Sequence, residues 1–296
     1  MRLLSYNMPK DWNYFLFGDG HVGAALRFDK GFKKLIHAMT HKYAGLASKY
    51  NFGIDHGDAI EAITIDDPRF SAFDSREACV LNQMEYAKKE YWPIRKKLLC
   101  MLDGNHPLKL HKFGPLTHYI CKQLGVSFGT MSARITFKNN GALQFKHFAC
   151  HGSGSIGSIA DDPERRKLNW RLSLKRKLRE KASDCLLQSC GHTHKIIVSP
   201  PTETLYLTDD GNKISQHYTG GHNKSYIHPD YRWYCNTGGF LRIYGNTVVE
   251  SDDIPLEQSK LGSGYAESFM YDPLQLGYCV GIIRDNVLQD IVVERL

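Results

Sequence analysis

Five short strand-like runs in this chain each end on side chains that bind metal ions, and this recurrence constrains the fold more than any other feature. Each run is rich in aliphatic and aromatic residues, as buried strands are. The blocks that follow the runs are DGH at 19–21, GD at 57–58, GNH at 104–106, a lone His151 and GHTH at 191–194. In α/β sheets, ligands bind beyond the carboxyl ends of the strands, so five such ends can meet at one site.

The stretches between these runs have the periodicity of amphipathic helices. Apolar residues recur at helical spacing over 28–39, 80–91 and 116–124, and Pro163 opens a basic helix that we expect to extend to about Ala182. Strands that alternate with helices in this way predict an α/β fold.

The remaining segments complete the domain. Asn139-Asn140-Gly141 separates two alternating runs, which is a strong signal for a β-hairpin, and the apolar tail at 277–296 predicts a closing β-hairpin. The composition of 199–232, rich in His, Tyr and Gly, predicts a loop or hairpin that leaves the core. Because the blocks are spread over most of the chain, we expect residues 1–296 to form a single domain.

The mixture of imidazole and carboxylate side chains in the blocks indicates the class of metal. Such a mixture suits borderline divalent ions such as manganese, iron, zinc or nickel, whereas calcium prefers oxygen ligands alone. A carboxylate has two oxygens and can bridge two ions. Two ions about 3.5 to 4 Å apart can hold phosphate oxygens and activate water for in-line attack.

The order D-x-H, G-D, G-N-H, lone His and G-H-x-H resembles the calcineurin-like metallophosphoesterase family, and the resemblance extends over residues 19–194. It implies a β-sandwich flanked by helices, with the metal site at the C-terminal ends of the strands. It also implies two divalent ions, with manganese as the first expectation, that share Asp58 as a bridge. The first ion would be held by Asp19, His21, Asp58 and His194, and the second by Asp58, Asn105, His151 and His192.

The same resemblance implies a catalytic pair. His106 matches the family's catalytic histidine, which donates a proton to the leaving oxygen or stabilises charge on the phosphoryl group. Glu61, three positions after the bridging aspartate, would orient it, although an exposed glutamate that opens a helix would satisfy the same sequence. The chain departs from the family at Pro107, where many members have an acidic residue, and at Gly20 within D-x-H.

The other histidines need a separate interpretation, because a single histidine is usually structural. His147 lies four residues before His151 in the same run, and we favour His151 as the ligand because it ends the run. His217 and His222 fall in the 199–232 excursion, where loops near an active site often select substrate.

Net charge and the basic helix favour an anionic partner. The formal net charge is +7, and the helix after Pro163 carries nine Lys or Arg residues. This helix either follows the phosphates of a nucleic acid or presents the solvated side of an amphipathic helix, and Leu168, Leu172 and Leu178 give it an apolar stripe for the second arrangement.

These observations predict a two-metal phosphoesterase that acts through a metal-activated hydroxide, with phosphodiesters such as nucleotides or nucleic acid favoured as substrates. A phosphomonoesterase acting on a small metabolite or nucleotide is the alternative, and a non-catalytic scaffold is a third. Residues 1–30 lack a secretory signal, and no apolar stretch reaches the length of a membrane span, so we expect a cytoplasmic protein with no membrane partner.

Overall fold

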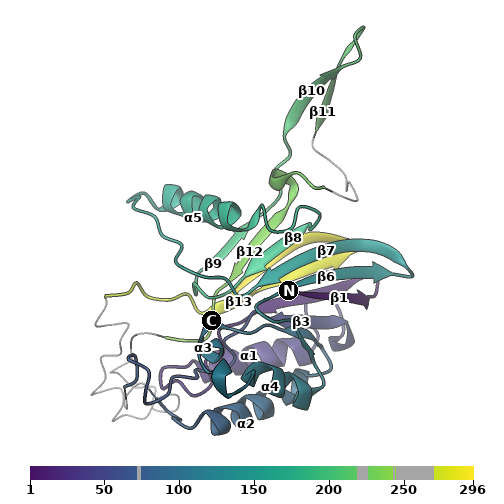
Figure 1. Cartoon of the computed structure of the whole chain (residues 1–296). Helices are drawn as coiled ribbons and strands as arrows, with labels where there is room; N and C mark the ends of the chain where they lie inside the picture. The colour runs from purple at the N-terminus through teal and green to yellow at the C-terminus, as the bar shows by residue number, and fades with distance from the viewer. Residues whose placement is uncertain (72–74, 219–225, 243, 245–269) are drawn as a thin grey trace.

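The computed structural model describes residues 1–71, 75–218, 226–242, 244 and 270–296, which form two six-stranded sheets, a separate two-stranded hairpin and five α-helices (Figure 1). The first sheet contains, in spatial order, β1 (Arg2–Asn7), β6 (Ser132–Asn139), β7 (Ala142–Cys150), β8 (Leu187–Cys190), β12 (Trp233–Thr237) and β9 (Ile196–Ser199). The strands β7, β8 and β12 are parallel to one another, while β6 and β9 run antiparallel to their neighbours β7 and β12.

The second sheet carries the first three metal-ligand blocks. It contains, in spatial order, β14 (Val287–Arg295), β13 (Gly277–Arg284), β2 (Trp12–Phe17), β3 (Asn51–Asp55), β4 (Leu98–Met101) and β5 (Ser127–Phe128). The four strands from β2 to β5 are parallel, and β13 runs antiparallel to both β2 and β14. The carboxyl ends of β2, β3 and β4 therefore lie side by side.

The two sheets pack face to face, and helices cover the outer face of each (Figure 1). The helices are α1 (Asp29–Thr40), α2 (Val80–Tyr91), α3 (Asn105–Leu108), α4 (Leu116–Leu124) and α5 (Pro163–Leu178), with 3-10 turns at Ser48–Tyr50, Trp92–Ile94, His111–Phe113 and Pro229–Tyr231. The helices α1, α2 and α4 pack on the second sheet, and α5 packs on the first. The chain is thus a mixed α/β protein, as the alternation of strands and helices predicted.

Strand β2 shows how the sequence produces these layers. All six of its residues are buried, so the strand is covered on both faces. Trp12 and Tyr14 point into the layer between the sheets, where Trp12 contacts Phe137 and Phe145 of the opposite sheet. Phe15 and its alternate neighbours point the other way, into the core under the helices.

The predicted Asn-Gly turn is present in the structure, and a second turn ends helix α4. Asn140 and Gly141 join β6 to β7 with φ of 49° and 83°, and a two-residue hairpin loop of this kind needs positive φ at both positions. Helix α4 ends at Gly125, which adopts the left-handed conformation with φ of 70°.

The predicted apolar stripe of α5 was wrong in two of its three residues. Leu174 and Leu178 are buried against the first sheet, whereas Leu168 and Leu172 are 53% and 54% exposed. The exposed pair lies about a third of the circumference of the helix away from the buried pair, at 3.6 residues per turn. Helix α5 also ends at Leu178, four residues before the expected end.

The excursion after β9 forms a hairpin of β10 (Leu205–Asp209) and β11 (Ile214–Tyr218), which projects away from the two sheets (Figure 1). His217 lies on this hairpin, where its ring stacks on Tyr206 and hydrogen-bonds Thr208. His222 lies outside the described residues. None of the helices that the structure describes is both long enough and apolar enough to span a lipid bilayer.

Candidate metal centre

Each of the five blocks begins within three residues of the end of a strand, and the two sheets bring the blocks together. The block at 19–21 follows β2, the block at 57–58 follows β3, and the block at 104–106 follows β4, all in the second sheet. His151 follows β7 and the block at 191–194 follows β8, which are parallel neighbours in the first sheet. The site therefore forms where the carboxyl ends of parallel strands from both sheets meet.

The backbone of these blocks is strained at the side chains that face the site. Five of the seven expected ligands have φ between 44° and 68°, a region that residues other than glycine rarely adopt. These residues are Asp19, His21, Asp58, His192 and His194. Such conformations cost on the order of 1–3 kcal/mol each and are concentrated at functional sites, where the surrounding structure holds them.

The first group of ligand atoms comes from Asp19, His21 and His194. The Nε2 atoms of His21 and His194 are 3.3 Å apart, and Nε2 of His194 is 3.3 Å from Oδ1 of Asp19. Metal bonds of about 2.0–2.2 Å place neighbouring ligand atoms at roughly this separation. Oδ1 of Asp19 is buried and has no hydrogen-bond partner in suitable geometry, while Oδ2 accepts a hydrogen bond from the backbone N–H of His192. This unsatisfied oxygen fits a metal ion.

The second group comes from Asp58, His151 and His192, with Asn105 between the two rings. Nε2 of His151 is 3.2 Å from Oδ2 of Asp58, and Oδ1 of Asn105 lies 2.8 Å from both Nε2 of His151 and Nδ1 of His192. Nδ1 of His151 is 2.8 Å from the carbonyl oxygen of His56, which accepts its proton and leaves Nε2 to bind a metal.

Electrostatics also favour a cation at this site. Burial raises the pKa of Asp58, but the neighbouring histidines His151, His106 and His21 together outweigh burial and hold this pKa well below its usual range. Burial likewise raises the pKa of Asp19, and His194 and His151 together more than offset this effect. Burial lowers the pKa of His151, but Asp58, Asp19 and the backbone carbonyl of His56 together raise it to about 9. Two buried carboxylates thus stay ionised only beside positive charge, which divalent ions would supply.

Glu61 and His106 lie together but not in the predicted arrangement. Oε2 of Glu61 is 2.5 Å from Nδ1 of His21 and 3.8 Å from Nδ1 of His106. Nδ1 of His106 instead donates to the backbone carbonyl of Glu61 at 2.6 Å. The carboxylate of Glu61 therefore orients His21, and its carbonyl oxygen orients His106.

His147 occupies a structural position in the core. Its Nδ1 is 2.9 Å from the hydroxyl of Tyr14, and its Nε2 is 2.6 Å from the hydroxyl of Ser189. The structure therefore places His151, and not His147, beside the other expected ligands.

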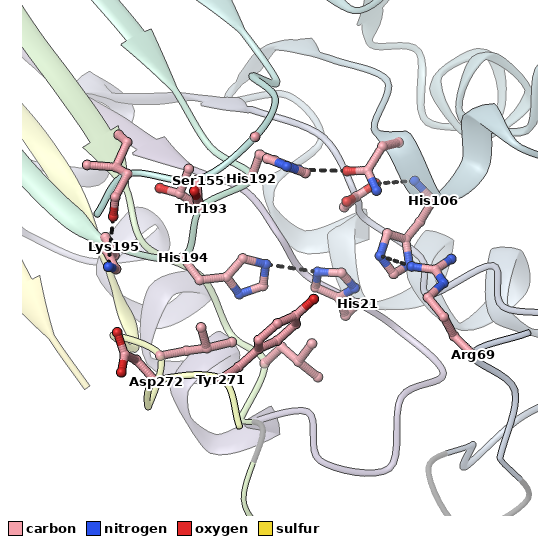
Figure 2. Close-up of a pocket in the computed structure, with 16 residues that line it drawn as sticks. His21, Arg69, His106, Ser155, His192, Thr193, His194, Lys195, Tyr271 and Asp272 are labelled. Carbon is pink, nitrogen blue, oxygen red and sulfur yellow. Dashed lines mark hydrogen bonds between the residues drawn. The ribbon is translucent and has the colours of Figure 1, made fainter. Parts of the chain in front are cut away.

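The candidate centre opens into a cavity of about 590 Å³ (Figure 2). Sequence reasoning missed two cations that line this cavity, Arg69 and Lys195. The guanidinium of Arg69 binds both carboxylate oxygens of Asp67 and approaches Nε2 of His106 at 3.2 Å. Arg69 belongs to a loop whose sequence has neither helical nor strand periodicity, so only its positive charge could have identified it as a candidate site residue. Lys195 directly follows the GHTH block, and this adjacency was the available signal.

Comparisons with known proteins identify no family. No protein-family model and no curated protein match the chain. A solved structure described as "a putative diadenosine tetraphosphatase" matches over 99% of this chain and 97% of its own, with 10% identity and a TM-score of 0.36. A TM-score this low does not define a shared fold, so the functional assignment depends on the geometry of the chain itself.

Proposed function

We propose that this chain is a two-metal-dependent phosphoesterase, with phosphodiesters as its preferred substrates. The single observation that supports this proposal most strongly is the meeting of two largely buried groups of ligand side chains at four strand ends. These groups are Asp19, His21 and His194, and Asp58, His151 and His192. If these side chains had only a structural role, two buried carboxylates and four histidines would be clustered without metal ions, which costs free energy because buried charges lose their hydration.

Each expected ligand residue has a proposed role in holding one or both ions. Asp19, His21 and His194 would hold one ion; Asn105, His151 and His192 would hold the other; and Asp58 would bridge the two. Bound divalent ions, with manganese as the first expectation, supply Lewis acidity that activates water and binds phosphate oxygens. The backbone N–H of His106 donates to Oδ1 of Asp58 at 3.0 Å and orients the proposed bridge.

His106 is the proposed proton donor. Its Nδ1 is occupied by the carbonyl of Glu61, so Nε2 is the atom that faces the cavity beside Arg69. Nε2 accepts a hydrogen bond from Arg69 in this structure, so it can protonate a leaving oxygen only when the ring carries a second proton at Nε2, and the guanidinium can stabilise negative charge on the phosphoryl group.

The preference for diesters is the finer part of the proposal. It depends on the double-histidine GHTH block, which resembles the phosphodiesterase and nuclease branches of the family, and it agrees with the net charge of +7. A phosphomonoesterase is the second candidate. A scaffold without catalysis is disfavoured because every ligand position is filled.

The test compares bis-p-nitrophenyl phosphate with p-nitrophenyl phosphate, using metal-stripped protein, protein reloaded with manganese, and the Asp58→Asn variant. We expect diester turnover that requires manganese and falls by at least about a hundredfold in the variant. Turnover of the monoester alone would favour the phosphatase. An absence of turnover with manganese, nickel, zinc and iron would refute the proposal and favour the scaffold.

A further inference from the structure

A second pocket adjoins the metal cavity, and the proposed function does not use it. Its volume is also about 590 Å³, and it lies between the loop at 157–161, helix α5 and residues 272–275. The two pockets share Lys195 and Asp272, so a molecule bound at the metal centre can extend past Lys195 into the second pocket.

Lys195 is a half-buried cation that is held by neutral groups. Its Nζ donates to the carbonyl oxygen of Ile156 at 2.8 Å (Figure 2). The same atom lies 4.9 Å from the centre of the Trp170 ring. Within the described part of the chain, no carboxylate forms an ion pair with this ammonium group. A partly desolvated cation without a counter-ion favours the binding of an anion.

Two further donors line the same pocket. Arg166 is anchored by the backbone carbonyls of Ala160 and Asp161, at 3.0 Å each, and forms no ion pair among the described residues. The Nε1 atom of Trp170 is buried and has no hydrogen-bond acceptor. A ligand with several strong acceptor oxygens would satisfy these groups together with Lys195.

We infer that this second pocket, centred on Lys195, Arg166 and Trp170, binds a second phosphate group of the substrate. The inference rests on the proposed function and narrows it to substrates that carry another phosphate close to the scissile one. A nucleic-acid strand and a nucleoside polyphosphate share this chemistry. The side chains of Asp161 and Asp272 also line the pocket, but both are exposed to water, which screens their repulsion of an anion.

The test measures binding by isothermal titration calorimetry to the full chain loaded with manganese. The ligands are thymidine 5′-monophosphate, thymidine 5′-diphosphate and thymidine 3′,5′-bisphosphate, with ligand integrity checked by phosphorus NMR. We expect at least one two-phosphate ligand to bind about tenfold more tightly than the monophosphate, as one charge-assisted hydrogen bond provides. A preference for the 3′,5′-bisphosphate would indicate a nucleic-acid strand, and a preference for the diphosphate a polyphosphate chain.

The variant Lys195→Gln should remove most of the difference in affinity between the two-phosphate ligand and the monophosphate. The substitution nearly keeps the length of the side chain and loses its charge. The control is Lys167→Gln on the exposed side of α5, which should retain the difference. Equal binding of all three ligands by the wild type, or a difference that survives Lys195→Gln, would overturn the inference. Hydrolysis of bis-p-nitrophenyl phosphate tests the proposed function separately, since that substrate has a single phosphate.

Discussion

At the scale of single residues, Glu61 could orient either His106 or His21, and the sequence could not distinguish these two roles. Its carboxylate contacts Nδ1 of His21, so it fixes the ring of a proposed metal ligand. We expect Glu61→Gln to raise the manganese concentration for half-maximal activity by about 10–100-fold, the usual effect of losing such a contact. Activity at saturating manganese should change little.

The measurement for this variant is a manganese titration of diester turnover, with Glu164→Gln on the surface of α5 as a matched control. A hundredfold loss of turnover that persists at saturating manganese would contradict the metal-orienting role. Such a loss would instead support the catalytic pair of His106 and Glu61 that the family resemblance implied.

Asp55, which precedes the G-D block, provides a prediction on pH. Burial raises the pKa of Asp55 to about 7, although Tyr91 and the backbone N–H of Gly57 donate hydrogen bonds to its carboxylate. The folded state therefore binds a proton that the unfolded state releases above its ordinary pKa of 3.8. The contribution of this group to stability is present below pH 3.8 and is lost as the pH rises toward about 7.

The variant Asp55→Asn cannot ionise, so its stability relative to the wild type should increase from pH 5 to pH 8. The expected change is on the order of a few kcal/mol, as linkage gives for a shift of this size. Urea unfolding of both proteins at the two pH values, with EDTA present, measures the difference. A difference that does not vary with pH would show that Asp55 is ionised in the fold throughout this range.

At the scale of elements, two leucines of α5 provide a test of which face of this helix packs on the first sheet. Leu174 is buried between α5 and the sheet, whereas Leu168 is 53% exposed. We expect Leu174→Ala to lower the free energy of unfolding by about 2–5 kcal/mol and Leu168→Ala by less than about 0.5 kcal/mol. Urea denaturation of the two variants measures these changes. Similar losses from both would mean that both leucines are buried in solution.

The β10–β11 hairpin should be dispensable for the chemistry at the metal centre. Its residues do not line the metal cavity, and Leu205 pairs with Tyr218 at the base of the hairpin. Joining these two residues through an Asn-Gly dipeptide deletes residues 206–217 and closes the chain across this pair. We expect unchanged diester turnover and a stability change of less than about 1 kcal/mol. A large loss of turnover would place the hairpin in the substrate site.

The sequence predicted the elements that carry the ligands because their signals are local. Helices α2 and α4 have the bounds that their apolar patterns indicated, and each ligand block follows a strand. The pairing of β1 with β6 and the division of the blocks between two sheets are contacts between distant segments, which periodicity does not encode. Arg69 was missed because tertiary packing alone brings it to the cavity, whereas Lys195 had a local signal in its adjacency to the GHTH block.

At the scale of the whole molecule, the metal centre joins the two sheets, because three ligand blocks come from the second sheet and two from the first. Ions that bind the folded state and not the unfolded chain stabilise it, by about 2.7 kcal/mol when the free ion is at a hundred times its dissociation constant. For a chain of 296 residues, this gain corresponds to a rise in Tm of roughly 4–5 °C.

We therefore expect manganese to raise the Tm of metal-stripped protein by several degrees, measured by calorimetry at increasing manganese concentrations. In Asp58→Asn, which lacks the proposed bridge, most of this rise should disappear. An equal rise in Tm in both proteins would place manganese elsewhere. The centre would then be an arrangement of hydrogen-bonded side chains and not a link between the sheets.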